Sequence, residues 1–148
     1  MITINGRFRL ALVEKIVNSR GTEIWLLNGI RHRPNGPAIL RLDGSQEWWV
    51  KGQLRRDDGP AKIWPNGDMA WYLDGILHRE DGPAVIGHSG YQAWYTNGRI
   101  HRLDGPAIIY PDGTEYWYTN GRIHRDGGPA ITYANGTEAW YVDGELSS

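Results

Sequence analysis

The chain has 148 residues, including 20 glycines, eight tryptophans, eight tyrosines and no cysteine, and its formal net charge is -1 at pH 7. Without cysteine, disulfide bonds, thiolate metal sites and thiol nucleophiles are excluded, which is typical of a cytoplasmic protein. The balanced charge provides no overall attraction to nucleic acid or anionic lipid. Because no run reaches about 18 apolar residues and the start lacks a secretory leader, we expect a soluble cytoplasmic protein without membrane insertion.

A 23-residue period runs along the chain. Gly-Pro-Ala begins at Gly36 and recurs at every 23rd position to Gly128, and tryptophan recurs with the same step from Trp25 to Trp140. The turn pairs follow this step too, at Asn5-Gly6, Asn28-Gly29, Lys51-Gly52, Asp74-Gly75, Asn97-Gly98, Asn120-Gly121 and Asp143-Gly144. Such pairs favour tight hairpins, because both central residues take positive φ. The sequence therefore predicts stacked β-hairpin repeats.

In chain order, residues 1–21 are a degenerate N-terminal capping repeat, with Val13-Glu14-Lys15 in place of Gly-Pro-Ala. Within it, RLALVEKIV is compatible with a longer strand or a short helix, and we favour the strand. Residues 22–136 are regular repeats, and residues 137–148 are a C-terminal partial repeat. We predict one all-β domain over residues 1–148, an elongated array of about six antiparallel hairpin repeats.

Strand alternation divides the side chains of each repeat between two faces. One face carries the tryptophan column, and the other carries an aromatic column from Trp49 to Tyr141. The tryptophan face has two interpretations. It is either a second packed face, in which the arginine of each His-Arg pair lies across an indole, or an exposed stripe that binds a partner.

The spacing Tyr-x-Asn-Gly-x-x-His, the later Asp-Gly and the 23-residue period resemble MORN repeats. The extended His-Arg-x-Asp-Gly-Pro-Ala segment is similar to the MORN variants of bacterial, phage and giant-virus proteins. This resemblance implies a twisted antiparallel sheet that acts as an interaction scaffold, sometimes binds phospholipid and in one bacterial group serves as an antitoxin. It assigns the core aromatic positions to Tyr72, Tyr95, Tyr118 and Tyr141, and the small positions to Ala70, Ala93 and Ala139. The tryptophan column departs from the family pattern.

The segment His-Arg-x-Asp-Gly-Pro-Ala occurs at His78 and His101, with variants at His32, Arg55 and His124. As a structural motif, its Asp caps a turn, its Pro stops strand pairing and its Arg bonds the Asp two residues later. As a binding motif, its Arg column recognises an anionic partner. Five copies in one chain favour the structural role, because repeated motifs serve stacking.

The histidine column is not predicted to bind metal, because adjacent repeats lie about 10 Å apart and metal ligands lie at about 2.0–2.1 Å. The clearest break in the period is Gly87-His88-Ser89-Gly90. A His-Ser pair suggests nucleophilic catalysis, but no nucleophile elbow or orienting carboxylate can be placed beside it. We therefore expect neither an enzyme nor a cofactor.

We predict a non-enzymatic protein-interaction module, either a stoichiometric inhibitor or a scaffold, with a phage anti-defence or antitoxin-like role by analogy. The alternative is a protein that sequesters a small nucleotide-like anion. Nucleic acid is disfavoured without a basic excess, and exposed end strands predict a monomer or a homodimer. The predicted partner-binding residues are Trp48, Trp71, Trp94, Trp117, His78, Arg79, His101, Arg102 and His88.

Overall fold

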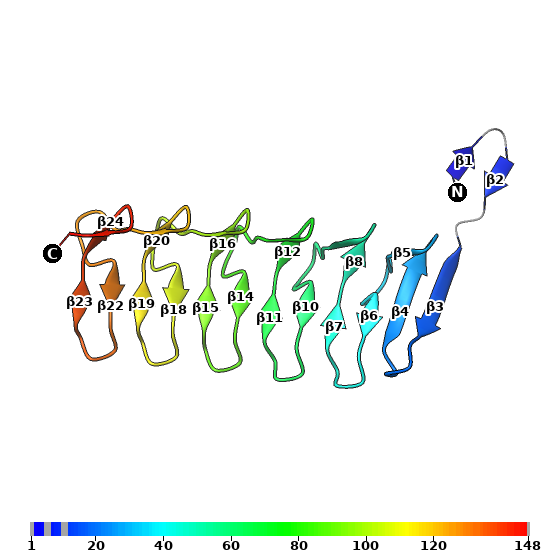
Figure 1. Cartoon of the computed structure of the whole chain (residues 1–148), viewed down its shortest axis with the longest axis horizontal. Helices are drawn as coiled ribbons and strands as arrows, with labels where there is room; N and C mark the ends of the chain where they lie inside the picture. Colours follow the sequence, from blue (N-terminus) through cyan, green and yellow to red (C-terminus); the bar gives the residue numbers. More distant parts are fainter. Residues whose placement is uncertain (1, 5–6, 10–11, 148) are drawn as a thin grey trace.

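A computed structural model of the chain describes residues 2–4, 7–9 and 12–147, with side chains from residue 12 onward. The described residues form an all-β fold, in which antiparallel hairpins stand side by side in one elongated row (Figure 1). The predicted array of β-hairpin repeats is therefore confirmed. The described residues include no helix long and apolar enough to cross a membrane.

The row is built on a 13-stranded sheet that runs from β3 at one end to β23 at the other. Each of its hairpins pairs two strands that are consecutive in this sheet. They are β3 (Val13–Val17) with β4 (Glu23–Leu27), β6 (Ile39–Leu40) with β7 (Gln46–Glu47), β10 (Lys62–Ile63) with β11 (Met69–Ala70), β14 (Val85–Ile86) with β15 (Gln92–Ala93), β18 (Ile108–Ile109) with β19 (Glu115–Tyr116), and β22 (Ile131–Thr132) with β23 (Glu138–Ala139). The strand favoured within RLALVEKIV is confirmed as β3, whereas Leu10 and Ala11 lie outside the described residues.

Smaller hairpins continue the chain above the main sheet (Figure 1). β5 (Ile30–Arg31) pairs with β4, and separate pairs are formed by β1 (Ile2–Ile4) with β2 (Arg7–Arg9), β8 (Trp49–Val50) with β9 (Gln53–Leu54), β12 (Tyr72–Leu73) with β13 (Ile76–Leu77), β16 (Tyr95–Thr96) with β17 (Arg99–Ile100), β20 (Tyr118–Thr119) with β21 (Arg122–Ile123), and β24 (Tyr141–Val142) with β25 (Glu145–Leu146). Their turns confirm the predicted backbone. Asn97 has φ 50° and Gly98 has φ 76°, both positive.

Lys51 is the one lysine at this turn position, and it has φ 49°. A left-handed conformation is strained for lysine, whereas asparagine adopts it readily. We expect Lys51→Asn to raise the free energy of unfolding by about 0.5 kcal/mol, a fraction of the left-handed penalty. Urea denaturation measures the change, and Asn97→Lys should have the opposite effect. Destabilisation by Lys51→Asn would contradict this account.

The cross-strand register gathers apolar side chains on one face of the main sheet. Val85 lies opposite Ala93, and Ala93 lies opposite Ile108. The alanines of the Gly-Pro-Ala segments, each directly before a strand of the main sheet, are 0% exposed at Ala38, Ala61, Ala84, Ala107 and Ala130. Among residues 12–147 no large side chain is fully buried, because a single layer has no second layer to cover it. The repeats must therefore bury apolar surface against one another.

Candidate functional site

Five arginine loops connect each small hairpin to the next hairpin of the main sheet, and they comprise residues 32–38, 55–61, 78–84, 101–107 and 124–130. In each loop the arginine stacks on the tryptophan eight residues earlier. The guanidinium carbon lies 3.8–4.2 Å from the ring centroid in the pairs Arg33–Trp25, Arg56–Trp48, Arg79–Trp71, Arg102–Trp94 and Arg125–Trp117. Of the two interpretations of the tryptophan face, the one with arginine stacked on indole is confirmed for these pairs, and each indole is half-buried.

The other side of each guanidinium faces the glycine of Gly-Pro-Ala. A Cβ atom built on Gly105 would lie 2.7 Å from the guanidinium carbon of Arg102, and one on Gly82 would lie 3.1 Å from that of Arg79. Neither glycine has a positive φ. Glycine is therefore needed here for space, because the guanidinium lies between an indole ring and a bare backbone.

The guanidinium edges are also occupied. Arg102 donates from Nε to Asp104 at 2.9 Å and from Nη1 to the carbonyl of Pro106 at 3.2 Å. The same Arg–Asp contact occurs between Arg79 and Asp81, and it also joins residues 56 and 58. The predicted Arg–Asp contact is confirmed in these three loops. Hydrogen bonding by the arginine lowers the pKa of the Asp81 and Asp104 carboxyls.

The histidine column ties adjacent repeats together. His78 Nδ1 accepts a hydrogen bond from the backbone N–H of Asn97 at 3.1 Å, and His101 Nδ1 accepts one from Asn120 at the same distance. Equivalent contacts join residues 32 and 51, and residues 124 and 143. The histidine side chains in these pairs therefore bind the turn of the following repeat. No group of three potential metal ligands occurs among the described residues.

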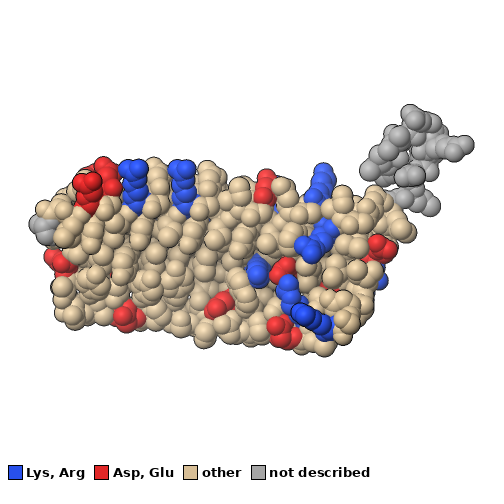
Figure 2. Space-filling model, in the orientation of Figure 1, with Lys and Arg blue, Asp and Glu red and all other residues tan. Residues whose placement is uncertain are grey.

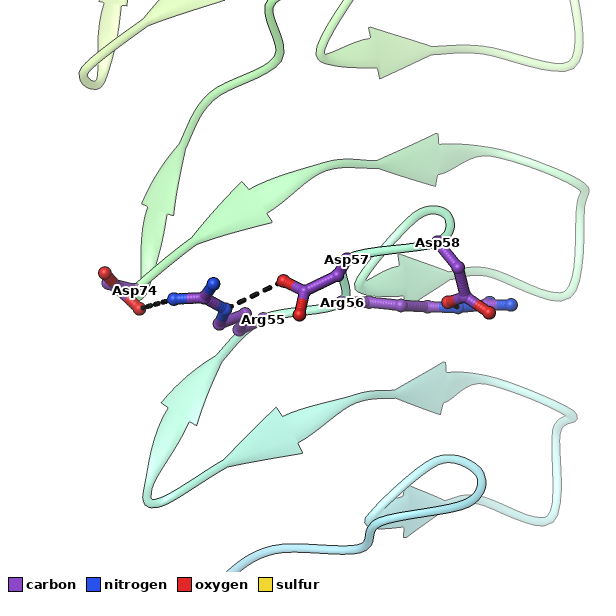
Figure 3. Close-up of polar contacts among 5 residues, drawn as sticks. All are labelled: Arg55, Arg56, Asp57, Asp58 and Asp74. Carbon is purple, nitrogen blue, oxygen red and sulfur yellow. Dashed lines mark hydrogen bonds and ion pairs between the residues drawn. The ribbon is translucent and has the colours of Figure 1, made fainter.

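Arg55 replaces histidine in the second arginine loop and makes the same connection by different chemistry. Its Nε donates to Asp57 at 2.9 Å, and its Nη1 donates to Asp74 in the turn of the next repeat at 2.8 Å. Figure 3 shows Arg55 between these two carboxylates, with Arg56 beside Asp58. The irregular repeat therefore keeps its link to the next turn as an ion pair.

Successive arginine loops are separated by open grooves of about 430–630 Å³. The groove between loops 55–61 and 78–84 is lined by Trp71, His78 and the two loops, and the next groove by Trp94, His101 and Arg102. The carboxylates of the loops stand at the rim, where they are 78–91% exposed: Asp57, Asp58, Glu80, Asp81, Asp104 and Asp126. In this row of grooves, arginine side chains form the walls and carboxylates face the solvent.

Eight of the nine predicted partner-binding residues line these grooves, namely Trp48, Trp71, Trp94, Trp117, His78, Arg79, His101 and Arg102. His88 lies apart, in the turn between β14 and β15 at the opposite end of the strands. There its backbone N–H and its Nδ1 each lie 2.8 Å from Asp68 Oδ1 of the preceding repeat. The break in the period at His88 is therefore a link between neighbouring turns. Ala134 donates to Thr114 Oγ1 in the same way.

The pKa of Asp68 is lowered to about 2, first because the backbone N–H of His88 donates to it, and then because the His88 and Asn66 side chains also do. A lowered pKa stabilises the fold above the ordinary carboxyl range, and this contribution is lost as the pH falls through about 2. We expect Asp68→Ala to lower the thermal midpoint at pH 5, with the difference from wild type shrinking between pH 4 and pH 2. Thr114→Val is the control, because a hydroxyl does not titrate there. A pH-independent difference for Asp68→Ala would contradict the assignment.

A buried carboxylate that was not predicted from the sequence lies on the face of the main sheet that carries Val85 and Ile108, in the same cross-strand row. Glu47 is 5% exposed, pairs with Arg41 at 2.8 Å and Lys62 at 3.6 Å, and accepts a hydrogen bond from Trp49 Nε1 at 3.0 Å. Burial by itself would raise its pKa, but the Arg41 and Trp49 hydrogen bonds and the nearby positive charges lower it. Figure 2 shows charges of both signs over this part of the face. The sequence contained one indication of this site, because Glu47, Trp49 and Lys62 all differ from the residues at the same positions of the other repeats.

Toward the C-terminal end the same face carries tyrosines in place of charges. The ring of Tyr110 lies 5.5 Å from Tyr91 and 5.6 Å from Tyr116, and Tyr133 lies 6.4 Å from Tyr116. Edge-to-face geometry in these pairs favours packing among the rings. This cluster therefore covers the sheet face.

These features define an elongated β-hairpin repeat protein with a regular row of grooves on one side. No model of a known protein family matches the chain, and no curated protein matches it in a sequence search.

Proposed function

We propose that the chain is a non-enzymatic interaction module that binds a partner protein along the row of grooves. The observation that carries this proposal is the repeated rim of exposed carboxylates above walls of arginine, tryptophan and histidine. An extended, periodic surface of this kind suits a partner that makes the same contact several times. The inhibitor or antitoxin-like version of this function rests on the MORN resemblance alone.

The charge of the rim determines the chemistry of the partner. Arg79 and Arg102 turn their guanidinium groups inward to indole, glycine and aspartate, whereas Glu80 and Asp126 are each 91% exposed. The rim aspartates that pair with Arg56, Arg79 and Arg102 are neutralised by them. The attraction for positive groups therefore rests on Glu80 and Asp126. The partner therefore presents lysine or arginine side chains to the grooves.

The repeat step sets the spacing of these contacts. Two main-sheet strands per repeat, each about 4.8 Å wide, separate successive grooves by about 10 Å. An extended segment advances about 3.3 Å per residue. Side chains three positions apart in a β-strand point to opposite faces, whereas in the polyproline II conformation, with three residues per turn and a rise of about 3.1 Å per residue, they share a face. A partner segment in that conformation along the row therefore presents a basic residue to the grooves at every third position.

Sequestration of a small nucleotide-like anion is less well supported. Such a ligand requires exposed guanidinium groups, but the side chains of Arg79 and Arg102 are only 22–23% exposed and already donate to a carboxylate and to a proline carbonyl. The exposed carboxylates at the groove mouths would also repel an anion.

The test uses the full chain with an affinity tag, recovered from a lysate of its native host and analysed by native mass spectrometry. We expect a stoichiometric partner that salt releases, because screening weakens exposed charge pairs. Reversal of the rim in Glu80→Lys with Asp126→Lys should abolish the complex. The charge-matched control, Glu115→Lys with Glu145→Lys, should keep it. Recovery of no stoichiometric protein, or equal binding by both double variants, would refute the proposal.

A further inference from the structure

Among the described residues, no further strand pairs with the two end strands of the main sheet, β3 and β23. Ile16 in β3 is 43% exposed, whereas Ile39, Ile108 and Ile131 at the same repeat position are only 5–7% exposed. At the other end Trp140 is exposed, while the preceding members of its column are half-buried. Each end therefore lacks the neighbour that buries its counterparts inside the array.

The two edges match each other in register. Inside the array, Tyr116 lies opposite Ile131 of the next repeat, and Glu115 lies opposite Thr132. Ile16 and Val17 have the place in β3 that Ile131 and Thr132 have in β22, because Ile16 pairs with Ile24 as Ile131 pairs with Ala139. Continuing the same register places Ala139 opposite Ile16 of a second copy, and Glu138 opposite its Val17.

The backbone groups at these edges are also complementary. Inside the array, each tryptophan N–H donates at 2.8 Å to the alanine carbonyl of the next repeat, as Trp117 does to Ala130. Lys15 has the same repeat position as these alanines, because it lies 23 residues before Ala38. Lys15 lies opposite Trp25, whose N–H donates to Ala38 and whose C=O accepts from His32, so the two residues form a pair without hydrogen bonds between them. The Lys15 carbonyl therefore points away from β4. Trp140 N–H therefore has a matching acceptor at Lys15 of a second copy.

Charge distinguishes this pairing from a symmetric one. The last 23 residues contain four acidic and no basic side chains, whereas residues 12–20 at the opposite end contain two basic side chains, Lys15 and Arg20, and one acidic side chain, Glu14. Figure 2 shows acidic side chains at the end where the C-terminus lies. Joining the C-terminal end of one copy to the N-terminal end of another brings opposite charges together, whereas joining two C-terminal ends brings like charges together.

We infer that the chain assembles head to tail with copies of itself, with β23 of one copy pairing antiparallel to β3 of the next. An open sheet edge is a template for such strand addition. β1 and β2 pair with each other and lie off the row of small hairpins in Figure 1. A head-to-tail contact leaves one free edge at each end of the assembly, so growth continues unless the row closes into a ring. This inference is independent of the partner proposed above.

Sedimentation velocity across a concentration series at low salt tests the assembly. We expect the wild-type chain to form species that lengthen with concentration and dissociate as salt is added. Val17→Pro removes an outward N–H from the N-terminal edge, and Glu138→Pro removes one from the C-terminal edge. Each variant alone should be monomeric. The controls Val17→Thr and Glu138→Gln keep the N–H and should assemble.

Mixing the two proline variants distinguishes the modes of assembly. Val17→Pro keeps a free β23 edge and Glu138→Pro keeps a free β3 edge, so an equimolar mixture should form a one-to-one heterodimer and nothing larger. Formation of this heterodimer also shows that both variants are folded. A wild-type chain that stays monomeric at every concentration would overturn the inference. So would a homodimer of either proline variant, or a mixture that stays monomeric while the controls assemble.

Discussion

Trp94→Ala is expected to lower the free energy of unfolding by about 3 kcal/mol, the lower part of the range for removal of a packed tryptophan. The indole is half-buried beneath Arg102, whose guanidinium carbon lies 4.0 Å from its ring centroid. Its removal deprives the guanidinium of its aromatic partner and uncovers the apolar surface that the indole buries. Urea denaturation followed by far-ultraviolet circular dichroism measures the change.

Trp140→Ala is the matched control from the same column. Trp140 is 37% exposed and has no arginine eight residues later, where the sequence has Ser148. We expect this variant to lose only about 1 kcal/mol, because less apolar surface is uncovered. Equal losses for the two variants would show that arginine stacking contributes little to the fold.

Gly105→Ala is expected to lower the free energy of unfolding by about 2 kcal/mol, the combined loss of a cation–π contact and a charged hydrogen bond. The added methyl group would lie 2.7 Å from the guanidinium carbon of Arg102. It therefore pushes the guanidinium off the Trp94 ring and away from Asp104. Urea denaturation again provides the measurement.

The mechanism is tested by a double-mutant cycle. In an Arg102→Ala background the guanidinium is absent, so Gly105→Ala should cost far less than in the wild-type chain. Additive losses in the double variant would mean that glycine is needed at this position for a reason unrelated to Arg102.

The hairpin turns were predictable because their chemistry is contained in two adjacent residues. Asn97-Gly98 requires only that both residues take positive φ, and the structure confirms this. The stacking of Arg102 on Trp94 was one of two interpretations of the tryptophan face that the sequence allowed, and its geometry is also local. These residues are eight positions apart within one repeat, so the same geometry recurs wherever the local sequence recurs.

The contacts of Asp68 and the histidine column were not predictable in this way. Asp68 meets His88 across 20 residues, and His78 meets Asn97 across 19. Both contacts depend on how one repeat is offset from the next. The sequence of a single repeat cannot distinguish a histidine that accepts a hydrogen bond from the next turn from a histidine that faces a ligand.

The sequence by itself determined the repeat length, the turn geometry and the two-faced strands, because these follow from period, positive φ and side-chain alternation. Only the tertiary structure decided that the guanidinium groups turn inward and the carboxylates outward. It also decided which side chains join neighbouring repeats and which strands remain as open edges. The physical reason is that stacking brings together residues that are distant in the chain, and their partners depend on the offset between repeats rather than on the sequence of any one of them.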